Sequence, residues 1–219
     1  MKITGAIFDM DGTLLNSMDY WGSVAEDFLR KNNLTAKVND NKRFLEWGMK
    51  EFHKYIVKEL GVTKSYDEVH SEIYSIMDEH YRNDVCLKDG AEEMLEKLHN
   101  SGVKMCLATA TDRSTVEIIL NRLGIEKYFS KIFTTGEVGV GKAQPKIYEL
   151  ALEFLGTDKE TTYVFEDAYY AISTAHNAGF NVVGVYDKNS IYPKDKIKEL
   201  CDIYLDENDR YNIESLINF

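Results

Sequence analysis

The sequence has little of what marks linkers, disulfide-rich scaffolds and membrane spans. Only 2 of its 219 residues are proline, which excludes a proline-rich linker or recognition module. Its 3 cysteines, Cys86, Cys106 and Cys201, are far apart and follow no zinc-binding pattern, so we expect free thiols in a reducing compartment. No run approaches the ~18 apolar residues of a membrane span.

Positive charge is also scarce. The 37 acidic residues exceed the 26 basic ones, and the formal net charge of −11 argues against a general binder of nucleic acid or of acidic membranes. The segment MKITGAIFDMDG reaches paired aspartates before the apolar stretch of a signal peptide forms. We therefore expect a cytoplasmic monomer that binds neither nucleic acid nor membrane.

The remaining composition is that of an ordinary globular protein, with 44% hydrophobic and 29% charged residues. At about 150 residues per domain, the length suggests one domain with a sizeable insertion. Residues 17–84 carry apolar side chains at helical spacing, as in Leu45, Met49, Phe52 and Ile56, and Ser65-x-x-Glu68 is a capping box. This range is expected to be a helical unit inserted between residues 1–16 and 85–219.

The rest of the chain alternates strands with helices. Strands are expected at 3–8, 103–108, 131–134, 163–165 and 181–186, with a last helix-strand-helix over 194–217. Asp89 with Glu92 and then Asp112 are expected to cap helices, and Pro145 to open one. This alternation predicts an α/β fold, a parallel sheet with helices on both faces.

Polar side chains stand directly after four of these strands or in the loops that follow them. Ligands of such sheets bind beyond the carboxyl ends of the strands, so these residues should share one edge. Clustered carboxylates favour a hard cation such as Mg²⁺, and a lysine beside it suits a phosphoryl group. A pair of aspartates separated by one residue lets one attack phosphorus while the other transfers protons. The residues are Asp9, Asp11, Thr109, Lys142, Glu166 and Asp167.

DMDGT at 9–13, the threonine at 109, GVGKAQPKIY around Lys142 and VFEDA at 164–168 resemble the motifs of the haloacid dehalogenase superfamily of Mg²⁺-dependent phosphohydrolases. The resemblance implies a Rossmann-like core and a helical cap like that of the β-phosphoglucomutase and phosphoglycolate phosphatase branch. It also implies catalytic roles for four residues. Asp9 would be the nucleophile that becomes an aspartyl-phosphate, Asp11 the general acid and base, and Thr109 and Lys142 would hold the phosphoryl oxygens.

The same resemblance implies the metal ligands. Mg²⁺ would be held by the carboxylates of Asp9 and Asp167, by the carbonyl of Asp11, and by Glu166 either directly or through water. Taken without the resemblance, Glu166 and Asp167 could equally cap the helix that begins near residue 168. Thr13 is expected to stabilise the turn after Asp9 rather than to take part in the chemistry.

Two departures from the family pattern bear on the site and on the substrate. The usual KPxPD loop reads KAQPK here, so Ala143 replaces a proline and Lys146 an acid. Trp21 stands where the mutase has a histidine in its first cap helix, and Lys50 is the nearest counterpart of its phosphate-binding arginine, although lysine is a poorer bidentate clamp. Trp21 could equally be cap core and Lys50 a solvated side chain. Both are nevertheless candidates for binding substrate.

The prediction is an Mg²⁺-dependent phosphatase acting on a small phosphorylated metabolite, such as a sugar phosphate. A phosphosugar mutase is the alternative, and a non-catalytic regulatory protein of the same fold is a third. The intact Asp9, Asp11, Lys142 and Asp167 oppose the last of these. The sequence does not name the substrate.

Overall fold

The computed structural model describes residues 2–36, 49–190, 192–209 and 211–214. The chain divides into two compact units, one formed by Met1–Asn16 with Cys86–Phe219 and the other by Ser17–Val85. We call them the sheet unit and the helical unit. Among the described helices, none is long and apolar enough to cross a bilayer.

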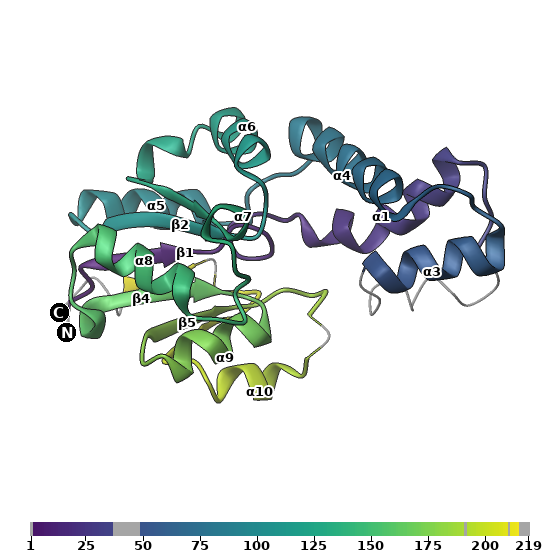
Figure 1. Cartoon of the computed structure of the whole chain (residues 1–219). Coiled ribbons are helices and arrows are strands. Elements are labelled where there is room, and N and C mark those ends of the chain that lie inside the picture. The colour runs from purple at the N-terminus through teal and green to yellow at the C-terminus, as the bar shows by residue number, and fades with distance from the viewer. Residues whose placement is uncertain (1, 37–48, 191, 210, 215–219) are drawn as a thin grey trace. The chain divides into compact units, whose positions relative to one another are not determined.

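The sheet unit is built on six parallel strands in the order β3-β2-β1-β4-β5-β6 (Figure 1). Their order reverses at β1, which lies between β2 and β4. The α/β fold predicted from the sequence is therefore confirmed. The strands are β1 (Gly5–Phe8), β2 (Lys104–Thr109), β3 (Ile132–Thr134), β4 (Thr162–Glu166), β5 (Asn181–Val185) and β6 (Ile203–Leu205).

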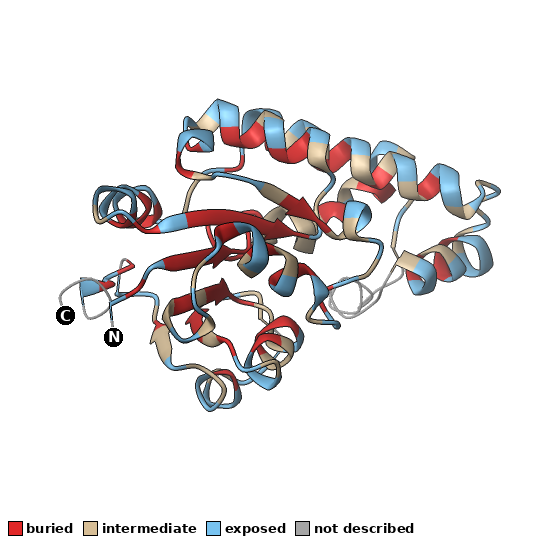
Figure 2. Ribbon diagram, turned by 60° about the vertical axis from the view of Figure 1, so that its left-hand side comes forward, coloured by how far each residue is buried: buried red, intermediate tan, exposed pale blue. Residues whose placement is uncertain are grey.

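Helices cover both faces of this sheet, so the strands are buried along almost their whole length (Figure 2). α8 (Lys146–Leu155) and α9 (Tyr169–Asn177) pack on one face, where Ile7 and Val164 meet Tyr148 and Ile172. α5 (Ala91–Asn100) and α6 (Arg113–Leu123) lie on the opposite face (Figure 1). The other elements of this unit are α7 (Thr135–Val138), α10 (Lys194–Lys198) and the 3₁₀ turns Glu126–Tyr128 and Lys159–Thr161.

Cys106 lies fully buried within β2, as its apolar neighbours in the sequence indicate. Burial raises the pKa of its thiol to about 12, so it stays protonated and behaves as a small apolar side chain. Cys86, Cys106 and Cys201, all of them described residues, form no disulfide.

The helical unit consists of α1 (Met18–Lys31), α3 (Met49–Leu60) and α4 (Tyr66–Asn83). α4 packs against both other helices, and its buried face includes Val69, Ile73 and Met77. The predicted capping box is confirmed, because Ser65 and Glu68 exchange both hydrogen bonds at the start of α4. Leu45 lies outside the described residues.

Some local predictions in the sheet unit were wrong. α5 begins after Gly90, whose φ of +85° sets the turn, and no side chain caps it, so Asp89 is not its cap. Asp112 is the N-cap residue of α6 but its side chain makes no capping hydrogen bond. Of the helix-strand-helix predicted over 194–217, α10 and β6 supply the first helix and the strand, and residues 215–217 lie outside the described residues.

Candidate active site

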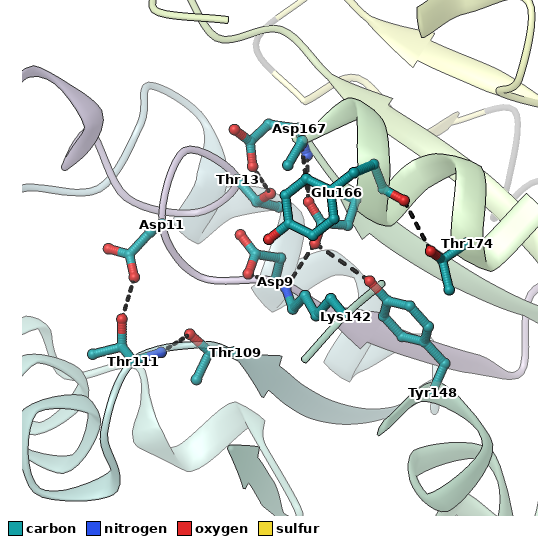
Figure 3. Close-up of polar contacts among 12 residues, drawn as sticks. Asp9, Asp11, Thr13, Thr109, Thr111, Lys142, Tyr148, Glu166, Asp167 and Thr174 are labelled. Carbon is teal, nitrogen blue, oxygen red and sulfur yellow. Dashed lines mark hydrogen bonds and ion pairs between the residues drawn. The ribbon is translucent and has the colours of Figure 1, made fainter. Parts of the chain in front are cut away.

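The site residues of the sheet unit lie where the strand order reverses. Asp9 directly follows β1, Thr109 ends β2, Glu166 ends β4, and Asp167 follows it. Because β1 pairs with both β2 and β4 in parallel, these strands bring their carboxyl ends to one edge. Lys142 comes from the loop between α7 and α8. Its side chain lies beside Asp9 and Glu166 (Figure 3).

Lys142 lies between two carboxylates in the centre of the site. Its ammonium group donates to Glu166 Oε1 at 2.6 Å and forms an ion pair with Asp9 Oδ1 (Figure 3). The three residues are nearly inaccessible to solvent, with exposures of 3% for Lys142, 1% for Glu166 and 7% for Asp9. An ammonium group fixed in this way is placed to neutralise oxygen atoms of a bound anion.

The acids of this cluster outnumber its lysine, and the pKa values reflect the surplus. Burial raises the pKa of Asp9 to about 6; the ion pair with Lys142 opposes the rise, and Glu166 adds to it. Burial also raises the pKa of Asp167 far above its usual range, and the charges of Glu166 and Asp9 contribute. Burial alone would lower the pKa of Lys142, but Asp9 and Glu166 raise it well above its usual value. The lysine therefore stays charged, and the acids need a further cation to ionise fully.

The donor set of this cluster fits a magnesium ion. Asp9, Glu166 and Asp167 each offer one carboxylate oxygen, and these oxygens lie within 4.8 Å of one another. A set made only of oxygen ligands, with a surplus of negative charge, is what Mg²⁺ prefers in proteins. The site therefore has both the ligands and the unbalanced charge that the ion would satisfy.

Neighbouring residues hold these carboxylates in place. The hydroxyl of Thr13 donates to Asp167 Oδ1 at 3.0 Å, so Thr13 supports the site as well as its own turn. Glu166 Oε2 accepts the backbone N–H groups of Asp167 and Ala168 at 2.9 and 3.0 Å, which fixes it at the start of α9. Both oxygens of Glu166 are thus engaged within the protein.

Gly12 makes the close approach of the first loop to Asp167 possible. Its φ is +80°, a backbone conformation that favours glycine, and a Cβ there would lie 2.7 Å from Asp167 Cγ. Any side chain at this position would displace the carboxylate. Both the close contact with Asp167 and the positive φ therefore favour glycine at this position of DMDGT.

Asp11 has a different environment from Asp9. It is partly exposed, and its Oδ2 accepts a hydrogen bond of 2.6 Å from the hydroxyl of Thr111. Thr109 is 1% exposed, and its hydroxyl oxygen accepts the N–H of Thr111 at 3.1 Å. This bond leaves the Thr109 hydroxyl hydrogen available to donate to a ligand.

Sequence reasoning missed four residues at or near this edge: Thr111, Tyr148, Lys88 and Asp187. Tyr148 is buried on α8, with its hydroxyl 3.4 Å from Glu166 Oε1. Lys88 and Asp187 form an ion pair of 2.9 Å, and both their charges act on Asp167. Asp187 comes two residues after β5, so the strand-end rule that selected Asp9 would have found it. The sequence carries no corresponding signal for Lys88.

The two candidates in the helical unit have different surroundings. Trp21 is partly buried on α1; its indole N–H donates to the Tyr81 hydroxyl at 3.1 Å, and its ring packs edge-on against Tyr74. Lys50, the second residue of α3, is exposed. Trp21 thus has a packing role within its unit, and the substrate contacts of both residues remain a prediction.

Comparison with known proteins assigns the class. The chain belongs to the haloacid dehalogenase-like hydrolase family, whose model matches residues 6–185, and it is therefore a hydrolase of this family. It is 29% identical over 198 residues to the mitochondrial (DL)-glycerol-3-phosphatase 1 of Arabidopsis thaliana, covering 85% of this chain and 65% of that protein. It is 28% identical to the phosphorylated carbohydrates phosphatase of Thermotoga maritima, covering 79% of this chain and 80% of that protein.

Solved structures share the fold. A candidate beta-phosphoglucomutase from Thermotoga maritima superposes with a TM-score of 0.84 at 23% identity, covering 97% of this chain and 99% of that one. CbbY from Rhodobacter sphaeroides, solved in complex with phosphate, gives a TM-score of 0.78 at 18% identity and covers 99% of this chain and 100% of that one.

Proposed function

We propose that this protein is an Mg²⁺-dependent phosphatase of a small phosphorylated metabolite, such as a sugar phosphate. The observation that carries the proposal is the buried Lys142, held between Asp9 and Glu166 with Asp167 beside them. The curated relatives named above act on glycerol 3-phosphate and on phosphorylated carbohydrates, which supports the same substrate class.

In the first step, a carboxylate oxygen of Asp9 attacks phosphorus and forms an aspartyl-phosphate while the bond to the leaving oxygen breaks. Asp11 gives its proton to that oxygen, so the alcohol leaves neutral. In the second step Asp11 takes a proton from water as the water attacks phosphorus, and Asp9 is released together with inorganic phosphate. Lys142 and the Thr109 hydroxyl neutralise and orient the phosphoryl oxygens throughout.

Asp9 and Asp167 are the proposed carboxylate ligands of the metal, together with the Asp11 carbonyl. Glu166 would contribute directly or through water, and its two oxygens also accept hydrogen bonds from Lys142 and from the backbone. When bound, Mg²⁺ supplies the positive charge that balances these acids and the phosphoryl group.

The test is the release of inorganic phosphate from a panel of sugar phosphates, phosphoglycolate and nucleotides, with Mg²⁺ and with a chelator. We expect at least one metabolite to be hydrolysed only with the metal, and Asp9→Asn to remove turnover because an amide cannot form the acyl phosphate. Interconversion of a phosphosugar without phosphate release would instead identify a mutase. Near wild-type turnover by Asp9→Asn would refute the nucleophile assignment.

A further inference from the structure

Two side chains lie together beside the central cluster, and only one of them has a role in the proposed reaction. Figure 3 shows Asp11 and Thr111 pointing toward one another, apart from Asp9, Lys142 and Glu166. The hydroxyl of Thr111 donates to Asp11 Oδ2 at 2.6 Å, a length typical of a strong hydrogen bond to a carboxylate. The two residues lie in the segments that follow the neighbouring strands β1 and β2, 100 positions apart in the chain.

The backbone on both sides of this bond is held by further hydrogen bonds. Phe8 of β1 pairs with Leu107 of β2, and both chains then continue to the same edge of the sheet. The N–H of Thr111 donates to the Thr109 hydroxyl at 3.1 Å, and Gly12 N–H donates to the Leu15 carbonyl at 3.1 Å. The Thr111 hydroxyl and the Asp11 carboxylate are therefore presented to each other by two ordered turns.

We propose that Thr111 is the positioning residue of Asp11 in the proton transfers, an inference that rests on the proposed phosphatase function. A hydroxyl can donate to a carboxylate and can also accept from a carboxylic acid, so it holds Asp11 in both of its protonation states. The hydroxyl proton stays on Thr111. The transferred proton passes only between Asp11 and the leaving oxygen, and later between water and Asp11.

Replacement of Thr111 by valine keeps the shape and removes the hydrogen bond, whereas serine keeps the hydroxyl. We expect Thr111→Val to lower kcat about tenfold or more for an alkyl phosphate, which needs a proton on its leaving oxygen, and to change it much less for p-nitrophenyl phosphate. KM should change little, and Thr111→Ser should restore most of the rate. The matched control is Thr4→Val, which removes a hydroxyl–hydroxyl bond of the same 2.6 Å length before the start of β1.

A double-mutant cycle separates this role from substrate binding. If Thr111 acts through Asp11, then Thr111→Val should cause no further loss of kcat in an Asp11→Asn background. An equal loss in both backgrounds, a rise in KM alone, or no rescue by serine would overturn the inference while leaving the phosphatase in place. A wild-type protein that releases phosphate from no ester would overturn both.

Discussion

Asp9 and Asp11 are separated by one residue but differ in burial and in partners. Asp9 is buried against Lys142, whereas Asp11 is partly exposed and bonded to a neutral hydroxyl. At a pH above its pKa of about 6, Asp9 is ionised beside the ammonium group of Lys142. The ionised carboxylate is the form that acts as a nucleophile. An acid outside that cluster, beside a hydroxyl, suits proton transfer, because either protonation state can be accommodated there.

Asp11→Asn should therefore affect turnover according to the leaving group. General acid catalysis contributes typically 10²–10⁴-fold, and we expect a loss in this range for sugar hydroxyls and a smaller loss for p-nitrophenolate. The measurement is kcat for both ester types with the wild type and the variant. Equal losses of kcat for the two ester types would count against the acid role. A slowed second step could also give equal losses, and a burst of alcohol release before the steady state would reveal it.

The residues collected at the strand ends could be predicted from sequence because each directly follows an apolar run or lies in the loop beyond it. The sheet order then places Asp9, Glu166 and Asp167 together. Thr111 lies two residues after β2, so the same rule reaches its position but not its role, and Lys88 could not be found in this way. Their importance depends on which side chain each one meets, and that is decided by packing between segments distant in the chain.

At the scale of elements, the sheet edge depends on contacts between segments that carry no regular structure. Lys88, in the segment before α5, donates to the Tyr186 carbonyl at 2.8 Å and pairs with Asp187 after β5. The side chains are 13% and 3% exposed, so the pair is largely removed from water. The ion pair therefore connects the segment before α5 with the segment after β5.

Lys88→Met should lower the free energy of unfolding by about 3–5 kcal/mol, because it leaves the buried Asp187 charge unpaired. The double variant Lys88→Met/Asp187→Asn should recover most of this loss, since the amide oxygen still accepts the Asn189 N–H as Asp187 Oδ1 does. Lys31→Met, which removes an exposed pair with Glu79, should cost less than 1 kcal/mol. Urea unfolding measures all three, and a loss in Lys88→Met no larger than in Lys31→Met would contradict the account.

For the whole molecule, the surplus of acids should make the proposed metal binding dependent on pH. The pKa of Asp9 is raised to about 6, so below this pH a proton occupies the group that the metal requires. The apparent affinity for Mg²⁺ should therefore weaken as pH falls below about 6, by roughly tenfold per pH unit for the Asp9 proton and more steeply where Asp167 also takes one. Calorimetric titration with Mg²⁺ at several pH values from about 7.5 to about 5 measures this affinity. Asp167→Asn is the control, because loss of a ligand should weaken binding at every pH in this range. Affinity unchanged over this range would exclude Asp9 as a ligand.

The helical unit is proposed to act as the cap that selects the substrate. Lys50→Ala and Trp21→Phe should change the order in which metabolites rank by rate of hydrolysis, and should leave the hydrolysis of p-nitrophenyl phosphate unchanged. The phenylalanine keeps an aromatic ring beside Tyr74. The exposed Lys58→Ala in the same helix as Lys50 is the control. An unchanged ranking in both variants would place the selecting residues elsewhere.

The most direct test of the account asks whether Asp9 becomes phosphorylated. Asp11→Asn, which slows the attack of water, is mixed with Mg²⁺ and p-nitrophenyl phosphate and quenched with acid, and the peptide containing residues 9–13 is examined by mass spectrometry. We predict one added phosphoryl group on Asp9, lost on treatment with hydroxylamine, and none in Asp9→Asn/Asp11→Asn. Phosphate release by the wild type with no phosphorylated peptide, or phosphorylation at another residue, would contradict the account.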